Sequence, residues 1–289
     1  MKKILGITLS MTISLMAEVI TMTPYGGVIK YDSDYAKSYK DKASLGGLHT
    51  TIGNLNYLVE FDYAHLQTQY KSYNPALADL KQDDISLIYG HYYTTMMYRI
   101  GVHYINTTDV QLNNGVAVVT TLGGYKWIGY NKLSYGSHGY LSYYKNGHDE
   151  NYVAKSITIG QLTPYISYYA PFSYVSSNTF SISVHYQYAP SYLTKEYISF
   201  EVSDSLYYKG YFLTLRGYNG KMRSGIKDGG ITVFNTLDMM RYGGDMKAGY
   251  YFSTSFSANV SYGLNNYKEY GMDEYGTNKV ALISMSYSF

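Results

Sequence analysis

Apolar and polar residues alternate in short segments along most of this chain. From Phe180 to Tyr188 every second residue is apolar or aromatic, and the residues between them are Ser, His and Gln. Residues 256–265 and 98–104 repeat the pattern. A two-residue period is typical of a β-strand with one apolar face. The sequence therefore predicts an all-β protein built from many such strands.

The polar face of these strands indicates which all-β architecture to expect. Only 15% of all residues are charged, and Ser, Gly, Asn, Thr and Tyr supply most of the polar positions. A soluble sandwich faces bulk water with its polar side, whereas a membrane barrel turns its apolar face to lipid and its polar face to the interior. The 40 tyrosines suit surfaces with one apolar and one wet side. We therefore predict a transmembrane antiparallel up-and-down β-barrel.

About 14 strands are predicted, an even number that places both termini on the same side of the membrane. Twelve or sixteen strands also fit, because 116–122 and 231–237 are each consistent with a strand or with the descending arm of a long loop. The strands are expected at residues 25–31, 44–53, 57–70, 84–93, 97–106, 126–136, 140–146, 153–165, 179–189, 195–204, 207–219, 243–253, 256–268 and 279–289.

Short and long connections mostly alternate between these strands. In transmembrane barrels the short turns are periplasmic and the long loops are extracellular. The short turns are expected at 54–56, 94–96, 136–139, 204–205 and 253–255. The longer polar loops are expected at 32–42, 72–83, 107–115, 146–151, 219–230 and 268–278.

The N-terminus has the pattern of a secretory signal peptide. Lys2 and Lys3 precede the mostly apolar stretch Ile4 to Met16, and Ala17 supplies a small residue for cleavage. Residues 1–17 are therefore expected to be removed, leaving 18–289 as a single barrel domain. Without Lys2 and Lys3 the 23 basic residues fall to 21, equal to the 21 acidic ones, which argues against a nucleic-acid partner. The absence of cysteine excludes disulfides and a lipid anchor.

The last eleven residues alternate and end in an aromatic side chain. Ile283, Met285, Tyr287 and Phe289 share one apolar face. This segment resembles the terminal strand of Gram-negative outer-membrane β-barrel proteins, which commonly end in Phe. The resemblance implies a porin-like barrel in the bacterial outer membrane, in contact with lipid and lipopolysaccharide. It also implies that the barrel assembly machinery reads these four residues as its signal. No subfamily is selected.

Several charged residues fall on the polar side of the alternation. An Arg or Lys facing lipid at the midplane costs about 2–4 kcal/mol, so these residues are expected to line the lumen. Opposed charges there would set a transverse field that filters small ions by size and sign. The basic set is Arg99, Arg216, Lys126, Lys132 and Lys247, and the acidic set is Glu60, Asp62 and Glu201.

Two functions fit this barrel. A barrel of about 14 strands is wider than the eight-stranded kind that side chains fill, which favours a water-filled lumen. We therefore predict a porin-like channel for passive diffusion of small hydrophilic solutes. The alternative is a structural or surface-binding barrel whose lumen is occluded by inward-folding loops and which acts through its extracellular loops.

Enzyme activity is not expected. The outer-membrane phospholipase type needs His-x-Ser, and none of the seven histidines is followed by Ser at that spacing. The barrel protease type needs Asp-x-His, and no histidine has Asp two residues before it. Metal-binding His-x-x-x-His spacing and glycine-rich phosphate loops are also absent, so no cofactor or metal is predicted.

Overall fold

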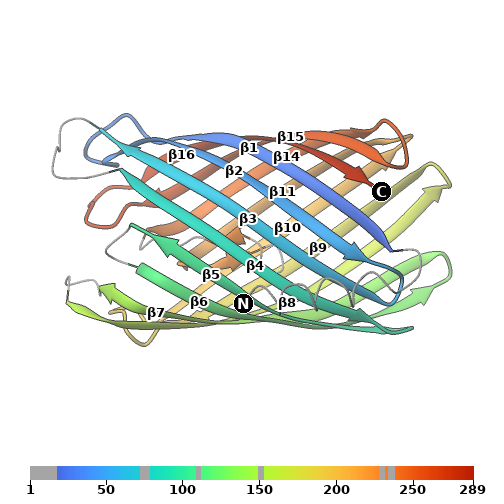
Figure 1. Cartoon of the computed structure of the whole chain (residues 1–289), viewed down its shortest axis with the longest axis horizontal. Coiled ribbons are helices and arrows are strands. Elements are labelled where there is room, and N and C mark those ends of the chain that lie inside the picture. Colours follow the sequence, from blue (N-terminus) through green and yellow to red (C-terminus); the bar gives the residue numbers. More distant parts are fainter. Residues whose placement is uncertain (1–17, 72–78, 109–111, 149–152, 228–231, 234–237) are drawn as a thin grey trace, which may run out of the picture.

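The computed structural model describes residues 18–71, 79–108, 112–148, 153–227, 232–233 and 238–289. Fourteen strands form one closed antiparallel barrel, and two short strands pair separately (Figure 1). The predicted signal peptide, residues 1–17, lies outside the described residues. The strands are β1 (Val19–Lys30), β2 (Lys40–Gly53), β3 (Tyr57–Tyr70), β4 (Leu80–Tyr92), β5 (Met96–Thr107), β6 (Leu112–Ile128), β7 (Asn131–His148), β8 (Ala154–Ser173), β9 (Ser176–Tyr188), β10 (Glu196–Tyr208), β11 (Tyr211–Arg223), β12 (Ile226–Lys227), β13 (Thr232–Val233), β14 (Met239–Tyr251), β15 (Phe256–Lys268) and β16 (Gly276–Ser288).

The all-β class, the antiparallel closure and the number of barrel strands confirm the prediction. In the part of the chain that the structure describes, no helix has the length and apolar character needed to cross a membrane. Consecutive barrel strands pair with each other, and β1 pairs with β16 to close the sheet. Closure leaves no unpaired strand edge, which is the condition for a sheet to lie in hydrocarbon.

Two predicted turns are wrong. The segment 136–139 lies inside β7, and the chain turns instead at Gly129 and Tyr130. Gly129 has φ +62°, a conformation that glycine adopts without steric cost. The segment 204–205 lies inside β10, and the chain turns at Lys209 and Gly210, both with positive φ. Each of these two turns therefore contains a glycine with positive φ.

The turn at Gly129 shifts two predicted strands. The strand expected at 126–136 spans this turn, so the correct strands are β6 and β7, and 140–146 is only part of β7. The uncertain segment 116–122 lies within β6. Of the second uncertain segment, 231–237, only Thr232–Val233 is described, as the two-residue β13. The total remains 14 because β6 and β7 replace two predicted strands.

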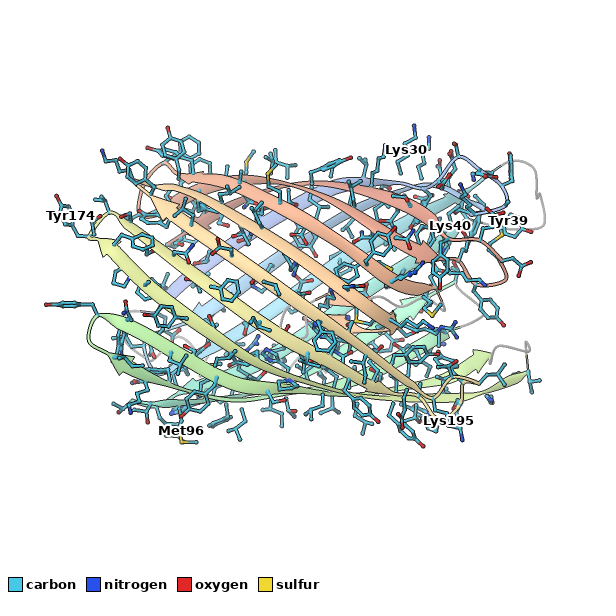
Figure 2. The ribbon with its side chains drawn as sticks, turned by 180° about the vertical axis from the view of Figure 1, so that it is seen from behind. Lys30, Tyr39, Lys40, Met96, Tyr174 and Lys195 are labelled. Carbon is cyan, nitrogen blue, oxygen red and sulfur yellow. The ribbon has the colours of Figure 1, made fainter. Side chains whose placement is uncertain are left out.

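The barrel has an apolar outside and a polar inside. On β5, Ile100 and Val102 are about half exposed on the outer face, while His103 on the inner face is buried. The same alternation runs around the sheet, and the outward side chains cover the barrel wall (Figure 2). Soluble monomers rarely expose contiguous apolar surfaces of this extent. The outer face is therefore suited to lipid.

The two ends of the barrel differ. At one end, connections of two to four residues join the strands, and both the start of β1 and the end of β16 lie there. Aromatic side chains ring the outer surface near this end, with Tyr174 fully exposed (Figure 2). Such aromatic girdles mark the membrane interface in transmembrane barrels. The other exposed aromatics of this rim include Tyr130, Tyr211, Phe252 and Phe289.

The C-terminal residues complete the closure. The Phe289 backbone N–H donates a hydrogen bond of 2.9 Å to the Ile20 carbonyl of β1. The Tyr287 and Phe289 rings make an edge-to-face contact with centroids 4.8 Å apart. Ile283, Met285 and Tyr287 are exposed on the outer face of β16, and Phe289, which follows the last residue of that strand, is also exposed. The residues predicted as an assembly signal thus lie together on the lipid-facing side of the closing strand.

Candidate functional site: the barrel interior and its inserted segment

The acidic residues of β3 face the interior as the alternation predicts. Glu60 and Asp62 are buried there, while Phe61 between them is exposed outside. Arg99 of β5 donates two hydrogen bonds to Glu60 Oε1, from Nη2 at 2.5 Å and from Nε at 3.0 Å. A Cβ at Gly90 of β4 would stand 3.0 Å from Arg99 Cγ, so the glycine leaves room for the Arg99 side chain to reach across β4 to Glu60.

A second ion pair lies across the barrel from the first, on β11 and β14. Arg216 of β11 and Asp245 of β14 are directly opposite in register, with Nε and Oδ2 2.7 Å apart. Lys247, two residues further along β14, lies with its ammonium 6.0 Å from the Phe212 ring centroid. Arg99 and Arg216 are thus each paired with a carboxylate on their own part of the wall. The sequence had instead predicted opposite charges facing each other across the lumen.

The two predicted lysines of β6 and β7 lie at the short-turn rim. Lys132 is opposite Trp127 in register, with its ammonium 5.8 Å from that ring. Lys126 is opposite Leu133 and continues the outward series of Val118 and Leu122, so it lies outside the interior, contrary to the prediction. A lysine at the rim can extend its ammonium to water. The free-energy cost of a charge in lipid, on which the inward prediction rested, therefore does not apply to Lys126.

The interior holds further ionisable side chains that the prediction missed. Asp62 Oδ2 lies 3.4 Å from His49 Nδ1, and Asp84 Oδ1 lies 3.4 Å from His103 Nε2. Asp84 shares the inward series of Gln82 and Ser86, so the alternation of β4 contained the signal. Asp245 follows Gly243 and Gly244, which interrupt the polar and apolar alternation of β14. The sequence therefore does not indicate which residues of this strand face the interior.

A segment between β11 and β14 folds into the barrel. Gln161 of β8 donates a hydrogen bond of 2.7 Å to the Ile226 carbonyl and accepts one of 3.1 Å from the Ile226 N–H. Gln187 of β9 accepts a hydrogen bond of 3.0 Å from the Arg223 N–H and donates one to Gln161. The two glutamines therefore satisfy the backbone of this segment as a neighbouring strand would. We call residues 224–227 the inserted segment.

Side chains of the inserted segment reinforce this docking. Ile226 is buried in one cluster with Ile88, Val119 and Tyr140 of the inner wall. Lys227 places its ammonium 2.7 Å from Glu201 Oε2 and 4.0 Å from the Tyr218 ring centroid. Glu201, predicted to line the lumen, thus holds the inserted segment instead of facing open water.

The inner wall consequently has a covered side and an accessible side. Many inward residues of β4 to β10, including Ser86, Thr163 and Ser199, are buried, although others, such as Ser181 and Ser183, keep partial exposure. A small cavity of about 170 Å³ remains beside the inserted segment, between Tyr165, His185 and Glu201 among others. In contrast, inward hydroxyl and amide side chains from β15, β16 and β1 keep partial exposure. They are Thr21, Thr23, Asn259, Ser261, Ser284, Ser286 and Ser288.

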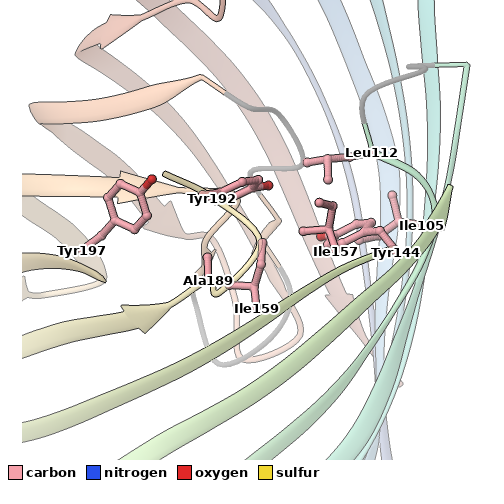
Figure 3. Close-up of a cluster of buried hydrophobic side chains, with 8 residues drawn as sticks. All are labelled: Ile105, Leu112, Tyr144, Ile157, Ile159, Ala189, Tyr192 and Tyr197. Carbon is pink, nitrogen blue, oxygen red and sulfur yellow. The ribbon is translucent and has the colours of Figure 1, made fainter. Parts of the chain in front are cut away.

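The connection between β9 and β10 fills another part of the long-loop half. Ala189 and Tyr192 are buried against Leu112, Tyr144 and Ile157, and Figure 3 shows this cluster inside the barrel wall. The cluster lies toward the long-loop end of β6, β7 and β8. This part of the interior is therefore apolar, in contrast to the accessible hydroxyl-bearing side.

Charged groups hold the long-loop end together on the other side. The Lys40 ammonium binds the Asp238 carboxylate, and the Ser38 hydroxyl donates a hydrogen bond of 2.5 Å to Glu269 Oε2. Burial raises the pKa of the Glu269 carboxyl above its ordinary value, and the nearby Lys40 charge only partly opposes that effect. No group of three or more His, Asp or Glu residues suited to a metal ion occurs among the described residues.

An apolar exterior, a polar interior and a closed sheet of 14 strands define the transmembrane β-barrel class. No protein-family profile and no curated protein matches the sequence. Known structures do match in fold, and among them are outer-membrane channels.

The monoaromatic hydrocarbon channel CymD is similar with a TM-score of 0.54 at 7% identity, over 95% of this chain and 89% of that one. The toluene transporter TodX of P. putida is similar with a TM-score of 0.52 at 8% identity, over 97% of this chain and 92% of that one. The NanC porin is similar with a TM-score of 0.50 at 8% identity, over 92% and 98%. At these identities the similarity is one of fold.

Proposed function

We propose that this chain is an outer-membrane channel through which small hydrophilic solutes diffuse passively. The observation that carries the proposal is the accessible inner wall of β15, β16 and β1, lined by hydroxyl and amide side chains. The inserted segment covers the opposite wall and narrows the interior to this side. A narrow polar path whose neighbouring arginines are paired with carboxylates selects by size and by hydrogen bonding more than by net charge.

The location follows from the exterior. The apolar outer face, the aromatic rim and the exposed C-terminal residues of β16 suit a barrel assembled into the outer membrane, with the long loops outside. Lipid is then a permanent partner. An enzymatic role gains no support from the interior, where Glu60 and Glu201 are engaged by Arg99 and Lys227.

The names of the similar proteins suggest two kinds of solute. CymD and TodX are named for monoaromatic hydrocarbons and toluene, and NanC is named a porin. A hydrocarbon path requires apolar walls, whereas Ser284, Ser286 and Asn259 present hydrogen-bonding groups on the accessible side. This lining favours hydrophilic solutes.

The alternative is a barrel with an occluded lumen that acts through its loops. The inserted segment and the buried cluster around Tyr192 favour it, because both place chain inside the long-loop half. The two functions differ in whether solute passes along the accessible wall.

Liposome swelling separates the two functions. We expect vesicles containing the refolded chain to swell in isotonic solutions of small polyols and amino acids, and to swell progressively more slowly as the solute grows to a disaccharide. Protein-free vesicles are the control. Swelling no faster than in the control, from protein shown to be folded, would favour the occluded barrel.

Neutralising charges tests which residues border the path. Arg99→Gln together with Arg216→Gln leaves Glu60 and Asp245 without their guanidinium partners, so the preference should shift towards cations. Glu60→Gln together with Asp62→Asn should shift it towards anions. At about 4 Å and an effective dielectric of about 20, such charges reach roughly 4 kcal/mol. The measurement is the reversal potential under a salt gradient; Lys126→Gln, on the outer rim, should leave it unchanged.

A further inference from the structure

Three lysines lie side by side on the outer face at the long-loop end of the barrel. Lys30 of β1 is directly opposite Lys279 of β16 and directly opposite Lys42 of β2. All three are exposed, and Figure 2 shows Lys30 pointing away from the barrel at this end. Residues directly opposite in an antiparallel sheet have Cβ atoms about 5 Å apart. We call these residues the lysine row.

The lysine row has no carboxylate to balance it. Among the described residues, none of the three ammonium groups lies within ion-pair distance of an acidic side chain, including Asp41 beside Lys42. Like charges directly opposite each other destabilise a sheet. An anion bound across the row would relieve this repulsion, and a phosphate monoester offers several acceptor oxygens to adjacent ammonium groups.

The outer surface next to the row is shallow. Moving toward the short-turn end, the next outward residues are Val28, Ala281 and Ser44, which are directly opposite one another. Beyond them, Gly26 of β1 is opposite Gly46 of β2, and a Cβ at either position would meet no atom closer than 3.7 Å. The lysine row is therefore followed by a low strip of wall on the lipid-facing side.

We propose that the lysine row binds the phosphate of an anionic lipid, with an acyl chain of that lipid lying over Gly26 and Gly46. The charge of the row selects the phosphorylated head group, and the low strip accommodates the chain beneath it. A free phosphate ion would use the lysines but not the strip. The proposal rests on the proposed membrane location, because it requires the outer face to contact lipid.

The test compares lipid retention by three forms of the full-length refolded protein. The row variant is Lys30→Gln, Lys42→Gln and Lys279→Gln. The matched control is Lys81→Gln, Lys145→Gln and Lys221→Gln, which removes the same charge from three exposed lysines on the separate strands β4, β7 and β11. Each protein is extracted from phosphatidylcholine vesicles that contain some lipid A, and bound lipid is counted by native mass spectrometry.

We expect the native chain and the matched control to retain lipid A, and the row variant to bind it about 100-fold more weakly, at roughly fivefold per lysine. Inorganic phosphate should compete only weakly. Equal retention by the row variant and the matched control would overturn the proposal, as would full competition by inorganic phosphate at matched concentration. The readout does not involve permeation. A non-conducting protein that retains lipid A would refute the channel and leave the lipid site standing.

Discussion

Ile100→Arg is expected to lower the free energy of unfolding in lipid vesicles by about 2–4 kcal/mol, the cost of placing Arg at the bilayer midplane on the outside of a barrel. Ile100 lies on the outer face of β5 and is 52% exposed. Its cross-strand neighbours Tyr89 and Thr120 also face outward, so no carboxylate stands ready to pair with the new guanidinium. The measurement is a urea titration of refolding into vesicles.

Ser284→Arg is the matched control for that substitution. Ser284 lies on the accessible inner wall of β16, opposite Tyr25 and Asn259. An arginine there reaches water in the interior, so we expect a change below about 1 kcal/mol. An equal decrease in the free energy of unfolding for the two variants would mean that lipid does not cover the outer face. The assignment of an apolar, lipid-facing exterior and a polar interior would then be wrong.

Gln161→Leu together with Gln187→Leu should raise the conductance of the channel severalfold. These glutamines make three hydrogen bonds to the backbone of Arg223 and Ile226. Each contributes about 0.5–1.5 kcal/mol net, so their loss weakens docking by roughly 2–4 kcal/mol. The burial of Ile226 and the ion pair of Lys227 with Glu201 then hold the inserted segment without these hydrogen bonds, so it leaves the interior more often.

The control for the glutamine pair is Gln82→Leu. Gln82 is buried on the inner face of β4 and donates a hydrogen bond of 2.8 Å to Asp84 of the same strand. Its substitution should leave conductance close to that of the native chain. If the Gln161 and Gln187 double variant also conducts like the native chain, the inserted segment does not narrow the path.

The sequence predicted features that alternate locally. Phe61 between Glu60 and Asp62 was enough to place both acids inside, and the apolar series ending at Phe289 was enough to place the closing strand. Both inferences need only the two-residue period of a strand. For the same reason Asp84 could have been found, because it shares the inward series with Gln82 and Ser86.

Other features depend on contacts between distant residues. Glycines occur both in the turn at Gly129 and inside β7 at Gly136 and Gly139, so composition alone did not locate the turn. Gly136 has a packing role within its strand, because a Cβ there would stand 2.5 Å from the Leu122 carbonyl oxygen and 2.8 Å from the Tyr165 hydroxyl. Misplacing this turn is what assigned Lys126 to the interior.

The position of the inserted segment also depends on contacts between residues far apart in the sequence. Its anchors, Gln161 and Gln187, lie 65 and 36 residues from the backbone groups they bind. The two glutamine amides bind only backbone N–H and carbonyl groups, which every non-proline residue has. The alternation of residues along the chain therefore cannot predict which segment they bind. The pairings of Arg99 with Glu60 and of Glu201 with Lys227 are hidden for the same reason, because each partner comes from a different strand.

Single-channel recording of the native chain in a planar bilayer tests the central claim most directly. Solute passage along the hydroxyl-lined wall predicts discrete, ohmic current steps from protein that is folded by gel mobility before and after boiling. The steps should be smaller than those of the Gln161 and Gln187 double variant, because the inserted segment remains docked. A folded native chain that inserts into the bilayer and gives no current steps would contradict the channel and leave a barrel that acts through its loops.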